Sequence, residues 1–108
     1  MAEHHVSAAQ NGARVTIRVG DRIALRLPEN ATTGYRWAIA SLDKARFDIE
    51  DSGFRPQGDA VGSGGEAFWN LGARSAGKSR VELVLWRQWE GEKSIIERFA
   101  FDVDVSES

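Results

Sequence analysis

The sequence predicts an all-β protein, an immunoglobulin-like antiparallel β-sandwich of seven or eight strands. Apolar and polar residues alternate with a period of two through most of the chain, the pattern of strands with one buried and one solvated face. No segment has the pattern of a long amphipathic helix, and no repeat of about 20–50 residues is present. The 108 residues, 42% of them hydrophobic, suffice for one compact core. We therefore expect a single domain over residues 11–106 and a disordered tail over residues 1–10.

Four strands are predicted in the N-terminal half, from alternating residues in segments 14–19, 22–27, 35–39 and 47–49. Gly20 and Asp21 predict a tight turn between the first two strands. Pro28 predicts the end of the second strand, because proline lacks the N–H that a sheet ladder uses. Residues 41–46 allow a short helical piece between the third and fourth strands.

Three more strands are predicted in the C-terminal half, over residues 67–71, 81–85 and 99–105. Before them, glycines at 53, 58, 62, 64 and 65, together with Pro56, predict a loop over residues 52–65. The last strand has the cleanest alternation, with an expected buried face made of Phe99, Phe101, Val103 and Val105.

The composition excludes several classes of partner. A net charge of -2, from 14 basic and 16 acidic residues, provides no excess for binding nucleic acid phosphates. The longest apolar run, residues 83–86, is far shorter than the roughly 20 residues of a membrane helix. We expect a monomer with neither a nucleic acid nor a membrane partner. No basic segment followed by an apolar run opens the sequence, which favours the cytoplasm, or the periplasm or secretion if a signal peptide has been removed.

The sequence does not predict an enzyme, a metal site or a cofactor. It contains no cysteine, and His4 and His5 both lie in the expected tail, so no nucleophile and base pair is visible. Carboxylates at 48 and 50, and at 102 and 104, alternate with core residues and should point to water. A small hydrolase that uses Asp102 and Asp104 is the least favoured alternative.

Three loop segments give the strongest functional signal. They are Asn30-Ala31-Thr32-Thr33-Gly34-Tyr35, Gly62-Ser63-Gly64-Gly65 and Arg87-Gln88-Trp89, the last directly after Trp86. Alternate loops of such a sandwich gather at one end of the scaffold, where segments far apart in the chain form one surface. In this order and spacing, and over most of the chain from Asn11-Gly12-Ala13 to Glu97-Arg98-Phe99, the sequence resembles the chagasin family of cysteine-peptidase inhibitors.

The resemblance implies a reversible, non-covalent inhibitor that fills the active-site cleft of papain-like cysteine peptidases with these three loops. All residues of the three segments are then candidate contacts, and Trp89 is the expected main contact. Arg87 fits two roles, a contact to the enzyme or an internal brace for the third loop. The family typically has proline where this chain has Ala31 and Gln88, so the loops should lose about 0.4–1 kcal/mol of preorganisation at such a site.

Trp37, Trp69 and Trp86 fall within alternating patterns and are expected to be structural. An immunoglobulin-like carbohydrate- or protein-binding module without peptidase inhibition is the alternative function, because exposed tryptophan and glycine-rich loops also suit sugar stacking and adhesion.

Overall fold

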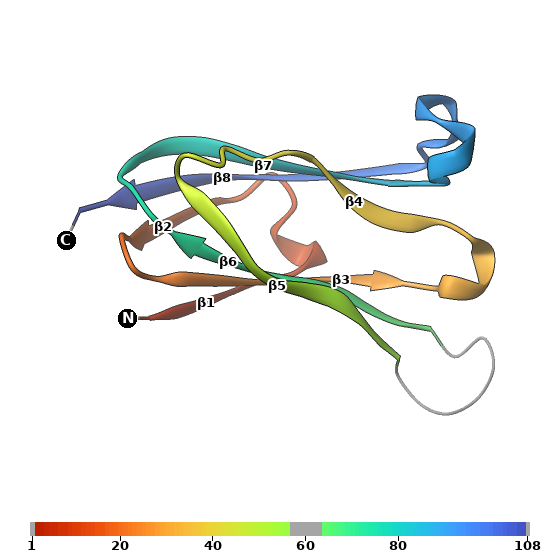
Figure 1. The fold of residues 1–108 in the computed structure, drawn as a ribbon, viewed down its shortest axis with the longest axis horizontal. Coiled ribbons are helices and arrows are strands. Elements are labelled where there is room, and N and C mark those ends of the chain that lie inside the picture. Colours follow the sequence, from red (N-terminus) through yellow and green to blue (C-terminus); the bar gives the residue numbers. More distant parts are fainter. Residues whose placement is uncertain (1, 57–63, 108) are drawn as a thin grey trace.

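The structure, a computed structural model, describes residues 2–56 and 64–107. Within these ranges, eight strands form two four-stranded sheets that pack face to face (Figure 1). The predicted all-β, immunoglobulin-like sandwich is therefore confirmed. In the same part of the chain, no helix has the length and apolar character needed to cross a bilayer.

The first sheet has the strand order β1-β3-β6-β5, and the second has the order β2-β8-β7-β4. In chain order, the strands are β1 (Glu3–Val6), β2 (Arg14–Arg18), β3 (Arg22–Glu29), β4 (Arg36–Ser41), β5 (Phe47–Pro56), β6 (Gly65–Ala73), β7 (Gly77–Trp86) and β8 (Glu97–Ser106). In the described part of the chain, four 3-10 helices lie between them, namely η1 (Ala8–Gln10), η2 (Ala31–Thr33), η3 (Gln88–Glu90) and η4 (Glu92–Ser94).

The core lies between the sheets and is made by the inward positions of the alternating strands. The predicted pattern is confirmed most clearly in β3 and β8, whose inward side chains are at most 3% exposed, namely Ile23, Leu25, Leu27, Phe99, Phe101, Val103 and Val105. Trp37 is also buried, at 8% exposure, as predicted. Trp69 is half-buried and packs against this core, whereas Trp86 is half-buried at the end of β7.

Two strand pairs are parallel, so both sheets are mixed rather than purely antiparallel. β1 pairs with β3, and β2 pairs with β8. The predicted turn at Gly20 and Asp21 is present, with Gly20 at φ +93° and the Asp21 N–H bonded to the Arg18 carbonyl at 3.0 Å. This turn carries the chain from the second sheet to the first. β2 therefore joins the C-terminal strand instead of forming a hairpin with β3.

The prediction that residues 1–10 form a disordered tail is wrong. Residues 3–6 form β1, and Val6 is 2% exposed in the core. The carboxylate of Asp21 holds the segment, because it accepts the Ala2 N–H at 3.0 Å and lies 2.9 Å from His4 Nε2. A short strand whose inward residue fills the core and whose polar ends have partners is ordered despite its terminal position.

Three smaller expectations are corrected. Pro28 lies inside β3 rather than ending the strand; β1 covers β3 only at residues 22–25, so one edge is open at Pro28 and tolerates a proline. Ile49 shares the alternation of buried Phe47 but is 46% exposed; it lies in β5, the edge strand of the first sheet, next to a bulge between Ile49 and Asp51. Residues 44–46 form a turn rather than a helical piece.

The connections at one end of the sandwich differ in the sheets that they join. β5 and β6, which are consecutive in the chain, both belong to the first sheet, and β7 and β8 both belong to the second sheet. Between β3 and β4, the chain crosses from the first sheet to the second. The η2 segment and the η3–η4 segment lie together at this end, whereas both termini lie at the opposite end (Figure 1).

Candidate functional site

The described parts of the three predicted loop segments come together at the end of the sandwich away from the termini (Figure 1). The first loop follows Glu29, the last residue of β3, and Glu29 is the register partner of Gly65, the first residue of β6 after the second loop. The first and third loops touch through side chains, as described below. Segments more than fifty residues apart in the chain therefore border one another.

The first loop is held by hydrogen bonds from its own side chains. Asn30 Oδ1 accepts the Thr32 N–H at 3.1 Å and the Thr32 hydroxyl at 2.7 Å. Thr33 Oγ1 donates to the Asn30 carbonyl at 2.9 Å and accepts the Tyr35 N–H at 3.2 Å. Both threonines are exposed, yet their hydroxyls already have partners within the loop. These bonds give the loop a preferred shape in place of the proline that this chain lacks at position 31.

The third loop is closed by Ser94, whose hydroxyl is buried beneath it. Ser94 Oγ accepts the Arg87 N–H at 3.0 Å and lies 2.9 Å from the Arg87 carbonyl and 2.6 Å from the Gly91 carbonyl. Gly91 has φ +77°, a backbone conformation that suits glycine. One hydroxyl therefore satisfies several backbone groups that the two short 3-10 helices leave open.

Arg87 connects the third loop to the first. Its Nη2 donates to the Thr33 carbonyl at 3.0 Å, and its guanidinium carbon lies 4.4 Å from the centre of the Tyr35 ring. Its Nη1 also lies 3.2 Å from Glu90 Oε2. Of the two roles that the sequence left open for Arg87, the structure shows the internal brace.

Gly34 completes the contact between these two loops. It has φ +82°, and a Cβ at this position would lie 3.2 Å from Trp89 Cη2 and 3.6 Å from Arg87 Nε. The glycine is needed both for the left-handed backbone and for the close approach of the Trp89 ring.

Trp89 presents the largest apolar surface at this end of the molecule. It is 72% exposed, more than any other large hydrophobic side chain in the described part of the chain. The neighbouring Gln88 is also exposed and begins η3. Because the edge of the Trp89 ring lies close to Gly34 while most of the ring faces solvent, the ring is oriented but free to contact a partner.

The second loop is described only in part, because Gly62 and Ser63 lie outside the described residues. Gly64 has φ +81°, and nothing lies within 4 Å of the place that a Cβ would take. Gly64 is therefore accessible and has the left-handed backbone that suits glycine. Gly65 is buried, and a Cβ there would lie 2.5 Å from Phe54 Cζ. Position 65 must therefore lack a side chain for the sandwich to pack, and this requirement is independent of any contact that the Gly65 backbone makes with a partner.

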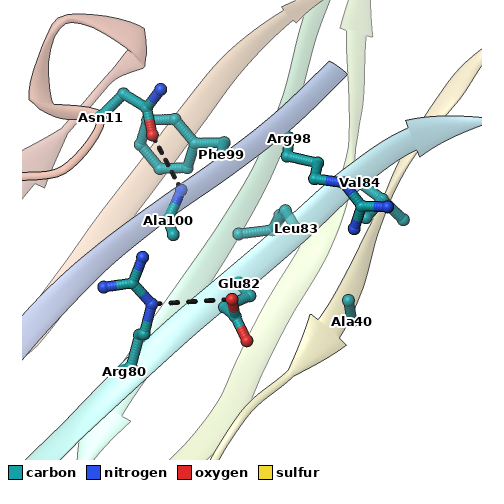
Figure 2. Close-up of a pocket in the computed structure, with 9 residues that line it drawn as sticks. All are labelled: Asn11, Ala40, Arg80, Glu82, Leu83, Val84, Arg98, Phe99 and Ala100. Carbon is teal, nitrogen blue, oxygen red and sulfur yellow. Dashed lines mark hydrogen bonds and ion pairs between the residues drawn. The ribbon is translucent and has the colours of Figure 1, made fainter. Parts of the chain in front are cut away.

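Asp102, one of the two carboxylates considered for a hydrolase, is held in an ion pair on an open sheet face. A hollow of about 260 Å³ lies over the outer face of β7 and β8 (Figure 2). On this face, Arg80 lies 3.2 Å from Asp102 and 3.6 Å from Glu82, and Asn11 Oδ1 accepts the Ala100 N–H at 3.0 Å. These groups satisfy one another, and none is paired with a nucleophile.

Sequence reasoning missed two residues that build the site, Glu29 and Ser94. Glu29 is 5% exposed, and a signal for it was present: it continues the inward parity of Leu25 and Leu27, so a charge on the buried face needs a partner. No comparable signal marks Ser94, which is 8% exposed in an irregular loop.

Fold and site together define a β-sandwich scaffold that presents a braced cluster of loops at one end. A model of the family described as chagasin family peptidase inhibitor I42 matches residues 16–103. Chagasin of Trypanosoma cruzi is 34% identical over 101 residues, which span 89% of this chain and 92% of that protein. This chain belongs to the chagasin family of peptidase inhibitors.

Solved structures share the fold over nearly the whole chain. The cysteine protease inhibitor EhICP2 from Entamoeba histolytica has a TM-score of 0.86 at 22% identity, covering 97% of this chain and 96% of that chain. PbICP-C, in a structure described as its complex with falcipain-2, has a TM-score of 0.57 at 14% identity, covering 97% of this chain and 99% of that chain. The matched family is described as peptidase inhibitors and EhICP2 is named as a cysteine protease inhibitor, in agreement with a sequence that does not predict an enzyme.

Proposed function

We propose that this chain inhibits papain-like cysteine peptidases reversibly, by placing its loop cluster in the active-site cleft without covalent chemistry. The observation that carries the proposal is the junction of Arg87, Thr33 and Gly34, beside which Trp89 is 72% exposed. Membership in a family of peptidase inhibitors supports the function. EhICP2, named above as a cysteine protease inhibitor, and the complex of PbICP-C with falcipain-2 support the class of enzyme.

The internal bonds of the loops supply the physical basis for tight binding. A protein interface of roughly 800 Å² per partner gives high affinity only where little ordering remains to be done on binding. Here Asn30 shapes the first loop, Ser94 closes the third, and Arg87 joins the two. The free inhibitor therefore already holds the arrangement that the cleft would accept.

The individual residues divide into contacts and supports. Thr32 and Thr33 are short and exposed, and each hydroxyl oxygen keeps acceptor capacity for a donor in the cleft. Gly64 allows main-chain pairing with the enzyme in the manner of an added strand. Trp89 would fill an apolar site on the far side of the cleft and contribute most of the binding energy.

Titration of papain with the purified protein tests the proposal. Activity should fall at or below micromolar inhibitor, and Trp89→Ala should weaken inhibition by about tenfold or more, which corresponds to about 1.4 kcal/mol. Ile49→Ala is the matched control, since Ile49 is also exposed but belongs to the bulge near the other end of β5. Full papain activity at micromolar protein would exclude the proposed function and favour a binding module of another kind.

A further inference from the structure

Glu29 carries a buried carboxylate at the base of the loop cluster. Its side chain is 1% exposed, whereas its ion-pair partner Arg36 is 60% exposed. A carboxylate in the interior is costly unless it is both paired and hydrogen-bonded, so a buried glutamate in a small sandwich needs a reason. Neither the packing of the core nor the contacts between the first and third loops explain why a glutamate is buried at this position.

The carboxylate closes the first loop from its two ends. Glu29 Oε1 accepts the Trp37 N–H at 2.6 Å, and Glu29 Oε2 lies 3.0 Å from Arg36 Nε. In parallel, the Trp37 indole N–H donates to the Pro28 carbonyl at 2.9 Å. Residues 28–29 are thus fixed to residues 36–37, with the loop of residues 30–35 between them.

These bonds also join the two sheets. Glu29 belongs to β3 in the first sheet, where its register partner is Gly65; Trp37 belongs to β4 in the second sheet, where its register partner is Leu85. Through the pairing of β3 with β6 and of β4 with β7, the carboxylate therefore links Gly65, at the base of the second loop, to β7, the strand that precedes the third loop. We call these contacts of Glu29 with Arg36 and Trp37 the sheet clamp.

The position of the second loop relative to the third depends on such a link. The second loop joins two strands of the first sheet, and the third loop joins two strands of the second sheet. Arg87 ties the third loop to the first, and among the described residues its hydrogen bonds, ion pair and cation–π contact go to these two loops rather than to Gly64 or Gly65. The distance from Gly64 to Trp89 therefore depends on how the two sheets are held together, to which the shared core and the contacts of Glu29 both contribute.

Arg36 extends the clamp toward the second loop. Its guanidinium carbon lies 6.0 Å from the centre of the Phe54 ring, at the outer limit of a cation–π contact. The same ring covers Gly65, where a Cβ would meet Phe54 Cζ at 2.5 Å. The Phe54 ring thus lies between the clamp and the described base of the second loop.

We propose that Glu29 is a positioning residue for inhibition, because its sheet clamp helps to set the spacing of Gly64 and Gly65 against Trp89 and so holds the cluster in the shape that a peptidase cleft accepts. The proposal rests on the proposed function. Glu29 itself does not touch the enzyme; it acts through the placement of the residues that do. Loss of the clamp should therefore alter the free inhibitor before any enzyme is present.

The test compares Glu29→Ala and Glu29→Gln with the wild type. Glu29→Ala removes both limbs of the clamp, and inhibition of papain should weaken tenfold or more. Glu29→Gln keeps an acceptor for the Trp37 N–H and loses the ion pair, so it should recover part of that loss. Glu50→Gln is the matched control: it breaks an exposed ion pair with Arg22 of 2.7 Å in the same sheet, and inhibition should stay within twofold of the wild type.

Amide NMR of the free proteins gives the second readout. In Glu29→Ala, the signals of Gly64, Gly65 and the Trp89 indole should shift, and in Glu50→Gln they should not. Inhibition by folded Glu29→Ala within twofold of the wild type would overturn the proposal. If Glu29→Ala does not fold, Glu29→Gln decides, and an inhibition constant and NMR signals equal to those of the wild type would overturn it. Should the wild type not inhibit papain at all, the proposed function fails, whereas the NMR shifts still decide whether the clamp sets the spacing.

Discussion

Replacement of Arg87 by methionine tests whether the brace between the first and third loops determines affinity. Methionine keeps a long apolar stem but loses the bond to the Thr33 carbonyl, the pair with Glu90 and the contact over Tyr35. A hydrogen bond from a charged group contributes about 1.5–3 kcal/mol, an exposed cation–π contact about 0.5–1 and an exposed ion pair about 0–1. Because the Arg87 side chain is 36% exposed, we take the low end of these ranges, about 2 kcal/mol.

If the brace is lost, the free energy that ordered the two loops must be supplied on binding. About 2 kcal/mol corresponds to roughly a 30-fold weaker inhibition constant. The assay is inhibition of papain by the wild type, Arg87→Met and a control, Arg80→Met. Arg80 is 52% exposed and also has ion pairs, but on the outer face of β7, so its replacement should change inhibition less than twofold.

The NMR signal of the Trp89 indole in the free inhibitor separates a brace from a direct contact. A brace predicts that Arg87→Met shifts or broadens this signal before any enzyme is added. A direct contact alone predicts weaker inhibition with an unchanged signal. Inhibition by Arg87→Met within twofold of the wild type would refute the reasoning that preorganisation limits affinity.

Two further substitutions have matched comparisons within the chain. Gly34→Ala should lower the thermal unfolding midpoint by at least about 4 °C, from about 1 kcal/mol of left-handed backbone strain, and should weaken inhibition because the new Cβ meets Trp89. Gly12 also has a left-handed backbone, at φ +81°, but has open space around it, so Gly12→Ala should lower the unfolding midpoint and leave inhibition unchanged. Equal inhibition by the two variants would contradict this reasoning. Asp21 has its pKa lowered from 3.8 to about 2, chiefly by the Ala2 N–H and then by His4 and Arg18, so its contribution to stability is complete above about pH 4 and is lost as the pH falls toward 2. The difference in unfolding midpoint between the wild type and Asp21→Asn should therefore shrink over that range, and a constant difference would be evidence against the assignment.

Strand positions could be predicted because burial on one face imposes a period of two. In β3 and β8 the inward residues are nearly all apolar, so the alternation was enough to find both the strands and their buried faces. The pairing of strands could not be predicted in this way. The Gly20-Asp21 turn is the same local structure whether the chain continues in one sheet or crosses to the other, and only the tertiary pairing of β2 with β8 distinguishes the two.

The candidate site was predictable in its position but not in its internal bonds. The three segments were found from sequence motifs, and their described parts do meet at one end. The supports depend on contacts between residues far apart in the chain, such as Arg87 with Thr33 and Glu29 with Trp37. A one-dimensional pattern shows that Glu29 lies on the inward face, yet it does not show which donor meets the carboxylate.

The braces hold the peptide backbone rather than side chains at the tip. Arg87 binds the carbonyl of Thr33, Glu29 accepts the amide of Trp37, and Ser94 bonds to backbone groups of Arg87 and Gly91. Exposed positions whose side chains are not among these anchors, such as 88, can therefore vary without loss of an anchoring atom. A library randomised at such positions, with the anchors left intact, would keep its frame and offer a route to inhibitors with altered selectivity.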